Sequence, residues 1–209
     1  NTLRLVYLPT TVLAELWGIP YLRHARALPS EAADFANSMI FLGFTCGAPL
    51  MGLLSDKLHQ RKPPMVIGAF GAFLMASILL YSPALTEFQL YLVLFLLGAF
   101  YSSQAIVFAV GRELAPIRAA GTAMAFTNML VMLGGMFLQP LVGWLLDISV
   151  TYRLGVKLKG LSPDNLFTIY TASDYHLALF IIPAGIFIAF LLTFLLKETY
   201  TKLDSRSGA

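Results

Sequence analysis

The stretch Phe88–Val110 reads FQLYLVLFLLGAFYSSQAIVFAV and contains no charged residue over 23 positions. The hydrocarbon core of a bilayer is about 30 Å thick, and a helix needs about 20 mostly apolar residues to cross it. A helix also satisfies its own backbone hydrogen bonds, which lipid cannot do. The stretch therefore predicts a membrane-spanning helix, and this prediction decides the class of the fold.

Five other stretches share this length and character. Together they predict six spans, at about Leu5–Leu22, Phe35–Ser55, Met65–Ser82, Phe88–Val110, Ala119–Leu146 and Leu177–Leu196. Only the first span contains a charged residue, Glu15. We therefore expect an all-α membrane protein with six transmembrane helices, in contact with the lipid bilayer.

The composition agrees with this class. Hydrophobic residues make up 58% of the 209 residues and charged residues 12%, about half of the roughly 25% usual for a soluble domain. These values exclude a disordered chain, a coiled coil and an ordinary soluble enzyme. One cysteine and three scattered histidines give no ligand spacing for a metal, and a net charge of +3 is too small for a nucleic-acid partner. We expect no cofactor and no enzymatic activity.

An internal repeat relates the two halves of the chain. At an offset of 91 residues, Asn37 falls on Asn128, Pro49 on Pro140 and Asp56 on Asp147. The offset contains three spans, and an odd number of spans inverts the second copy in the membrane. The alignment therefore predicts two inverted three-helix repeats, at residues 1–82 and 83–209, an arrangement typical of secondary transporters.

The basic residues predict the orientation. Six spans place both termini on one side, together with the loops at Asp56–Pro64 and Gly111–Arg118. That side has nine basic residues and the opposite side five. The positive-inside rule therefore places both termini in the cytoplasm.

The residues from Gly52 to Lys62 read GLLSDKLHQRK. This segment resembles the signature G-x-L-[AS]-D-[RK]-x-G-R-[RK]-[RK] of the major facilitator superfamily, with His59 in place of a glycine and Gln60 in place of an arginine. The resemblance extends over the chain and implies helices seven to twelve, the C-terminal half of a twelve-helix carrier. It also implies an N-terminal six-helix half as partner. The segment Glu15–Leu22 is similar to a bacterial branch, which implies the inner (plasma) membrane.

In the family this motif acts as a conformational lock at a helix end. The resemblance gives that role to five residues: Gly52, Asp56, Lys57, Arg61 and Lys62. Asp56 ends a span, where a carboxylate interacts favourably with the positive N-terminus of a neighbouring helix. The alternative is that Arg61 and Lys62 serve only as positive-inside anchors.

Candidate substrate residues lie in the spans that begin the two repeats. In the family these spans line the central cavity. They contain Glu15, Trp17, Tyr101 and Gln104. An ionisable group inside a membrane is costly unless it faces protein or water, so Glu15 is also a candidate for proton coupling; the alternative is a structural hydrogen bond. Asn37 and Asn128 are further candidates, either for lining the route or for bridging helices.

We therefore predict a secondary active transporter that moves a small polar solute by alternating access. An amino acid or peptide, an organic anion and a sugar all remain open as substrates, and proton coupling is a hypothesis. One alternative is a membrane receptor or sensor that kept the fold and lost transport. Another is a six-helix half-transporter that forms homodimers.

Overall fold

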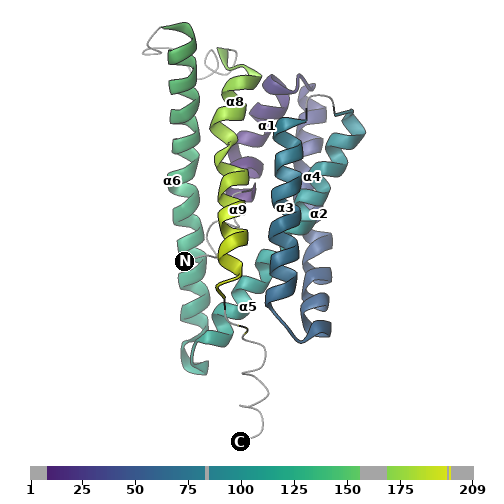
Figure 1. Ribbon diagram of the computed structural model, residues 1–209, viewed down its shortest axis with the longest axis vertical. Helices are drawn as coiled ribbons and strands as arrows, with labels where there is room; N and C mark the ends of the chain where they lie inside the picture. Colours follow the sequence, from purple (N-terminus) through teal and green to yellow (C-terminus); the bar gives the residue numbers. More distant parts are fainter. Residues whose placement is uncertain (1–8, 83–84, 156–168, 197, 199–209) are drawn as a thin grey trace, which may run out of the picture.

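The computed structural model describes residues 9–82, 85–155, 169–196 and 198, and every regular element in these ranges is helical. Figure 1 shows the long helices lying roughly side by side as a bundle. Within these residues, five helices or helix combinations are long and apolar enough to cross a membrane, namely Ser30–Leu58, Lys62–Tyr81, Glu87–Glu113, Ala120–Leu154 and Ala172–Thr193. The second to sixth predicted spans each coincide with one of them.

The first predicted span differs from the other five. Its beginning lies outside the described residues, and the described part consists of three short pieces: the π-helix η2 (Pro9–Trp17), α1 (Gly18–Pro20) and the π-helix η3 (Tyr21–Ala25). Pro9 and Pro20 lie at an end of two of these pieces. Proline lacks a backbone N–H and interrupts the regular helical hydrogen-bond pattern.

The helices α2 (Ser30–Leu58) and α3 (Lys62–Tyr81) follow, joined by a short turn. The fourth span consists of α4 (Glu87–Tyr101), the 3-10 turn η4 (Ser102–Gln104) and α5 (Ala105–Leu114). After the turn η5 (Ile117–Ala119) comes the long helix α6 (Ala120–Leu154). The last span consists of α8 (Ala172–Leu179) and α9 (Ile181–Thr193).

Three predicted boundaries differ from the helix ends by five residues or more. The second span begins at Ser30 rather than Phe35, the fifth ends at Leu154 rather than Leu146, and the last begins at Ala172 rather than Leu177. As a result Asp34 lies inside α2 and Asp147 inside α6, so Glu15 is not the only acidic residue within a spanning helix. Hydropathy detects the apolar part of a helix, whereas the helix itself continues into the polar interface as a regular backbone. At 1.5 Å per residue, the 35 residues of α6 extend about 50 Å, well beyond the hydrocarbon core.

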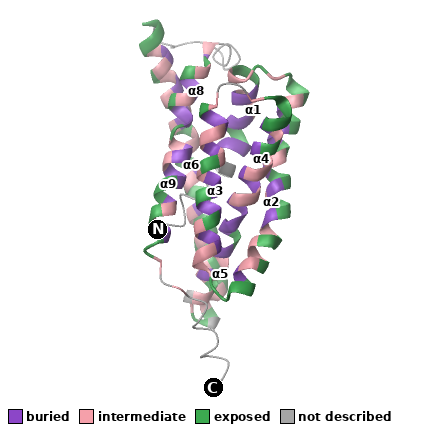
Figure 2. Ribbon diagram, turned by 45° about the vertical axis from the view of Figure 1, so that its right-hand side comes forward, coloured by how far each residue is buried: buried purple, intermediate pink, exposed green. Residues whose placement is uncertain are grey.

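The closest helix contact in the interior joins α2 and α4. A Cβ built on Gly43 would lie 1.9 Å from the carbonyl oxygen of Phe95, and one on Gly98 would lie 2.0 Å from that of Ile40. Glycine at both positions lets the two backbones touch, as small residues do between membrane helices. The fourth span is consequently the most enclosed, with 61% of its apolar window buried, whereas α2 and α6 reach only 22% each. Figure 2 shows exposed residues along the outer side of α2.

The bundle has two distinct ends. One end holds the α2–α3 turn, the α5–α6 connection and the C-terminal end of α9 (Figure 1, bottom). The other end holds the beginnings of α2 and α8 and the C-terminal end of α6 (Figure 1, top). The candidate lock residues therefore lie together at the first end.

Candidate functional site

The α2–α3 turn presents Arg61 at the centre of a polar network. Helix α2 ends at His59, which adopts a left-handed backbone conformation with φ of 52°. The N–H of His59 donates to the carbonyl oxygen of Asp56, and the N–H of Gln60 to that of Ser55, both at 3.2 Å. These two bonds form a Schellman cap. The cap reverses the chain within a few residues and brings Arg61 back toward the end of its own helix.

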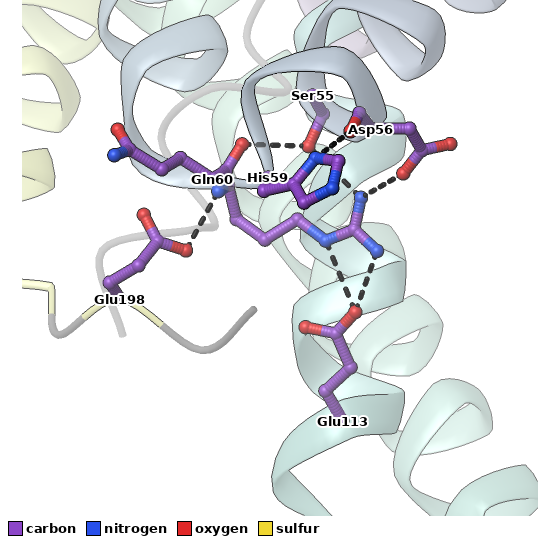
Figure 3. A network of polar contacts seen from close by, with 7 residues as sticks. Ser55, Asp56, His59, Gln60, Glu113 and Glu198 are labelled. Atoms are coloured by element: carbon purple, nitrogen blue, oxygen red, sulfur yellow. Dashed lines mark hydrogen bonds and ion pairs between the residues drawn. The ribbon is translucent and has the colours of Figure 1, made fainter. Parts of the chain in front are cut away.

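The Arg61 guanidinium joins side chains from two helices (Figure 3). Its Nη1 lies 2.8 Å from Oδ1 of Asp56 and 3.0 Å from Oγ of Ser55, on α2. Its Nη2 and Nε lie 2.8 and 3.1 Å from Oε1 of Glu113, at the end of α5. The pair with Glu113 is largely enclosed, with the two side chains 14% and 8% exposed, whereas Asp56 is 61% exposed.

Glu198 connects the end of the last span to the same turn. Its Oε1 accepts from the backbone N–H of Arg61 at 2.7 Å and its Oε2 from that of Lys62 at 3.1 Å. These amides begin α3, where an unpaired N–H and the positive helix end favour a carboxylate. Lys62 adds a second link, because its Nζ donates to the carbonyl oxygen of Phe194 at 2.7 Å.

The charge on Arg61 is secured by its partners. Partial burial lowers the pKa of the guanidinium, but the hydrogen bonds and charges of Glu113 and Asp56 outweigh it and raise the pKa above its ordinary value. Arg61 is therefore a permanent cation that holds the ends of α2, α3 and α5 together. Because this link consists of ion pairs at the edge of the bundle, a competing charge from a facing surface can weaken it.

The other candidate lock residues lie outside this network. Lys57 is exposed, and no atom of the described residues lies within 4 Å of a Cβ built on Gly52. His59 occupies the position that is glycine in the family signature, and it adopts the left-handed conformation that glycine favours. His59 therefore still ends α2 with the left-handed residue that the turn requires.

Glu15 lies on the exposed side of η2. Its Oε2 accepts from Nε2 of Gln139 at 3.4 Å. Gln139 is close to the middle of α6 (Ala120–Leu154), so the contact lies near half the length of that helix. Trp17 is buried beside it, donating from Nε1 to the backbone oxygen of Gln139 at 3.1 Å. The pair Glu15–Gln139 is thus accessible, and the buried indole of Trp17 fixes the backbone of Gln139 through its hydrogen bond.

The remaining substrate candidates divide between the interior and the surface. Tyr101 and Gln104 are buried within the bundle, where the Tyr101 ring packs 5.7 Å from that of Phe44. Asn37 is also buried and donates from Nδ2 to the carbonyl oxygen of Ala14 at 2.8 Å, which bridges α2 to the irregular first span. Asn128 is exposed on α6. The structure therefore brings Glu15 and Asn128 to the surface and keeps Tyr101, Gln104 and Asn37 inside.

Sequence reasoning missed Glu113, Glu198 and Gln139. Glu113 and Glu198 are far from Arg61 in the sequence, and no local motif connects them. A usable signal was present, because each is an acidic residue at the end of a predicted span on the side that has most basic residues. Gln139 offered a similar signal as an amide in the middle of an apolar stretch. Among the described residues, no three histidine, cysteine, aspartate or glutamate side chains gather as a metal site.

A comparison with protein families gives one match. A family model described as Major Facilitator Superfamily matches residues 5–209. No curated protein and no solved structure gives a significant match. The family match covers nearly the whole chain and includes both the Arg61 network and the Glu15–Gln139 pair.

Proposed function

Because the chain belongs to the major facilitator superfamily, we propose that it forms helices seven to twelve of a secondary active transporter. The cargo is a small polar solute, such as an amino acid or peptide, an organic anion or a sugar. It moves by alternating access between the two sides of the membrane. The observation that carries this proposal is the Arg61 network, in which ion pairs and hydrogen bonds join the ends of four helices at one end of the bundle.

The network functions as a conformational lock. Asp56 has one carboxylate oxygen on Arg61 and remains 61% exposed, so it is accessible to a helix end from a facing half. The exposed faces of α2 and α6 support an N-terminal six-helix half as that partner, because they are the least covered apolar helices of the described chain. In the whole transporter, closing of the two halves brings the surface around Asp56 into contact with the N-terminal half, and opening breaks this contact.

Inverted repeats at residues 1–82 and 83–209 are supported by matching irregularities. Pro49 lies inside α2 and Pro140 inside α6, and these prolines are 91 residues apart. At the same offset, the 3-10 turn Ser102–Gln104 in the fourth span corresponds to residues 11–13, within the π-helix of the first. Interrupted helices at equivalent positions of two repeats are typical of transporter binding sites. Together with the first predicted span, whose beginning lies outside the described residues, the total would be six.

Substrate contact in this half centres on Glu15. Its exposed carboxylate, on η2, lies beside Gln139 near the middle of α6 and is the most direct contact. Asn128 is exposed nearer the beginning of α6. Trp17 and Asn37 support this part of the first span through their hydrogen bonds to Gln139 and Ala14, and the buried Tyr101 and Gln104 are further candidates. Glu15 also suits proton coupling, since a carboxylate can alternate between a proton and another cation.

We propose that the Arg61 end faces the cytoplasm, with both termini on that side, in the inner (plasma) membrane of a bacterium. Of the described basic residues, five lie at that end and three at the other: Lys57, Arg61, Lys62, Arg112 and Arg118 against Arg23, Arg26 and Arg153. Cysteine labelling on a Cys46→Ser background tests this. Gln60→Cys should react with impermeant reagent only from the inside and Tyr152→Cys only from the outside; the reverse pattern would overturn the orientation.

The transport mechanism is tested with the full-length protein in proteoliposomes. Asp56→Asn should shift the ratio of inward-open to outward-open molecules, measured by accessibility labelling, while solute binding is retained. Asp34→Asn, an exposed carboxylate at the other end of α2, is the control. If transport and conformational exchange are both unchanged in Asp56→Asn, the lock is excluded and Arg61 and Lys62 act as anchors.

Two other functions remain as outcomes of the same measurements. Solute binding without uptake would indicate a receptor or sensor with a transporter fold. Uptake by the 209-residue chain alone, purified as a dimer, would indicate a homodimeric half-transporter. Loss of pH-driven accumulation in Glu15→Gln, with exchange retained, would support proton coupling, and unchanged accumulation would exclude it.

A further inference from the structure

The surface around Glu15 combines one carboxylate with an apolar environment. Leu16 beside it is 47% exposed, and on α6 Met132 and Met136 are 55% and 66% exposed. Met132 lies two helical turns before Gln139, so both side chains are on the same face of α6. The carboxylate of Glu15 therefore borders a surface of large, accessible apolar side chains.

Methionine is unusually frequent on this surface. Four of the eight methionines of the chain lie within 13 residues of α6, and all four are at least 40% exposed: Met124, Met129, Met132 and Met136. The thioether side chain is flexible and polarisable, and surfaces rich in methionine accommodate ligands of different shape. The composition of this face therefore suits an apolar ligand body rather than a sugar, which requires many fixed hydrogen-bonding groups.

Among the described residues, the basic side chains lie away from the depth of Glu15 in the bundle. Every lysine and arginine of the described residues lies at or near an end of a spanning element. Glu15 thus faces no basic side chain of the described residues at mid-height, and its carboxylate accepts a hydrogen bond from the amide of Gln139. A carboxylate at membrane depth is costly unless it faces protein or water, and a proton or a cationic ligand can neutralise its charge.

We propose that this half selects an organic cation, an amine or guanidinium group on an apolar body. The charged group binds the Glu15 carboxylate beside Gln139, and the apolar body lies on the methionine face of α6. The inference rests on the proposed transport function. Among its candidate solutes it favours amine-bearing compounds, including cationic peptides, over organic anions and sugars.

The test compares two probes of similar shape and opposite charge on the purified full-length transporter. Radiolabelled tetraphenylphosphonium should bind and tetraphenylborate should not. Glu15→Gln should weaken binding of the cation about ten- to a hundredfold, as expected for loss of a charged partner. Glu31→Gln, which removes an exposed carboxylate at the start of α2, should have no effect.

A charge reversal makes the result decisive. Glu15→Lys should lose the cation and gain affinity for tetraphenylborate; if this variant does not fold, the comparison of Glu15→Gln with Glu31→Gln decides. Equal binding of both probes, or cation binding unchanged in Glu15→Gln, would overturn the inference. Uptake of a sugar or an anion that is unaffected by Glu15→Gln would also overturn it and leave the transport function standing. Glu15-dependent cation binding without uptake of any solute would support the inference and exclude transport.

Discussion

The guanidinium of Arg61 and the carboxylate of Glu113 form the more enclosed of the two ion pairs at the α2–α3 turn, with Nη2 2.8 Å from Oε1. Arg61 follows α2 directly, whereas Glu113 belongs to the fourth span, 52 residues later. The pair therefore links the α2–α3 turn to the fourth spanning helix combination, that is, the two repeats that we propose. Asp56 also pairs with Arg61 but is far more exposed than Glu113. We therefore expect the carboxylates of Asp56 and Glu113 to contribute differently to stability.

Glu113→Gln should destabilise the protein more than Asp56→Asn does. It leaves the partly buried Arg61 charge without its main partner, and loss of one partner of an enclosed hydrogen-bonded group costs about 1–3 kcal/mol. An exposed pair such as Arg61–Asp56 contributes about 0–1 kcal/mol. Thermal unfolding in detergent measures both changes. Equal losses in the two variants would show that Glu113 is no more important than the surface carboxylate.

The contact between α2 and α4 predicts a second effect on stability. In Gly98→Ala the new Cβ would lie 2.0 Å from the carbonyl oxygen of Ile40, so the two backbones must separate. Overpacking of this kind costs about 1–3 kcal/mol. Gly121→Ala on α6 has no described atom within 4 Å of its Cβ and should keep or slightly raise stability, because alanine favours helix more than glycine does. A similar melting temperature for both variants would contradict the close approach.

The sequence predicted the spans better than the contacts between them. Long uncharged stretches identify five spanning helices because the cost of charge in lipid acts on each residue separately. Hydropathy does not detect helix ends such as Ser30 and Leu154, since a helix can continue into water without an apolar sequence. The interruption of the first span arises from the backbone near Pro9 and Pro20. The partners Glu113 and Glu198 depend on packing of distant spans, which no local pattern records.

At the opposite end, Tyr170 predicts a dependence on pH. Its hydroxyl donates to Oδ1 of Asp147 at 2.7 Å. Burial and this hydrogen bond raise the pKa of the phenol well above its ordinary value of about 10. A raised folded-state pKa means that the contribution to stability is complete below pH 10 and is lost as the pH rises toward the folded-state value. The difference in stability between wild type and Tyr170→Phe should therefore fall by about 1.4 kcal/mol per pH unit above pH 10.

Unfolding at pH 8, 10 and 11 measures this difference. Tyr152→Phe, at a side chain that is 92% exposed, controls for the substitution itself. A constant difference between wild type and Tyr170→Phe over this range would contradict the hydrogen bond to Asp147.

The last prediction concerns His59, which ends α2 with φ of 52°. The left-handed conformation costs a residue with a Cβ about 1–2 kcal/mol, and glycine avoids this cost while losing about 0.5–1 kcal/mol of chain entropy. The contact of His59 Nδ1 with the carbonyl oxygen of Asp56 is exposed to solvent and contributes little. His59→Gly should therefore raise the free energy of unfolding by about 0.5–1 kcal/mol. His59→Val should lower it, because a β-branched residue is strongly disfavoured in this conformation. Both variants retain Asp56, Arg61 and Glu113, so thermal unfolding reports the turn alone. Loss of stability in His59→Gly would show that the imidazole contact, and not the backbone conformation, determines which residue the turn requires.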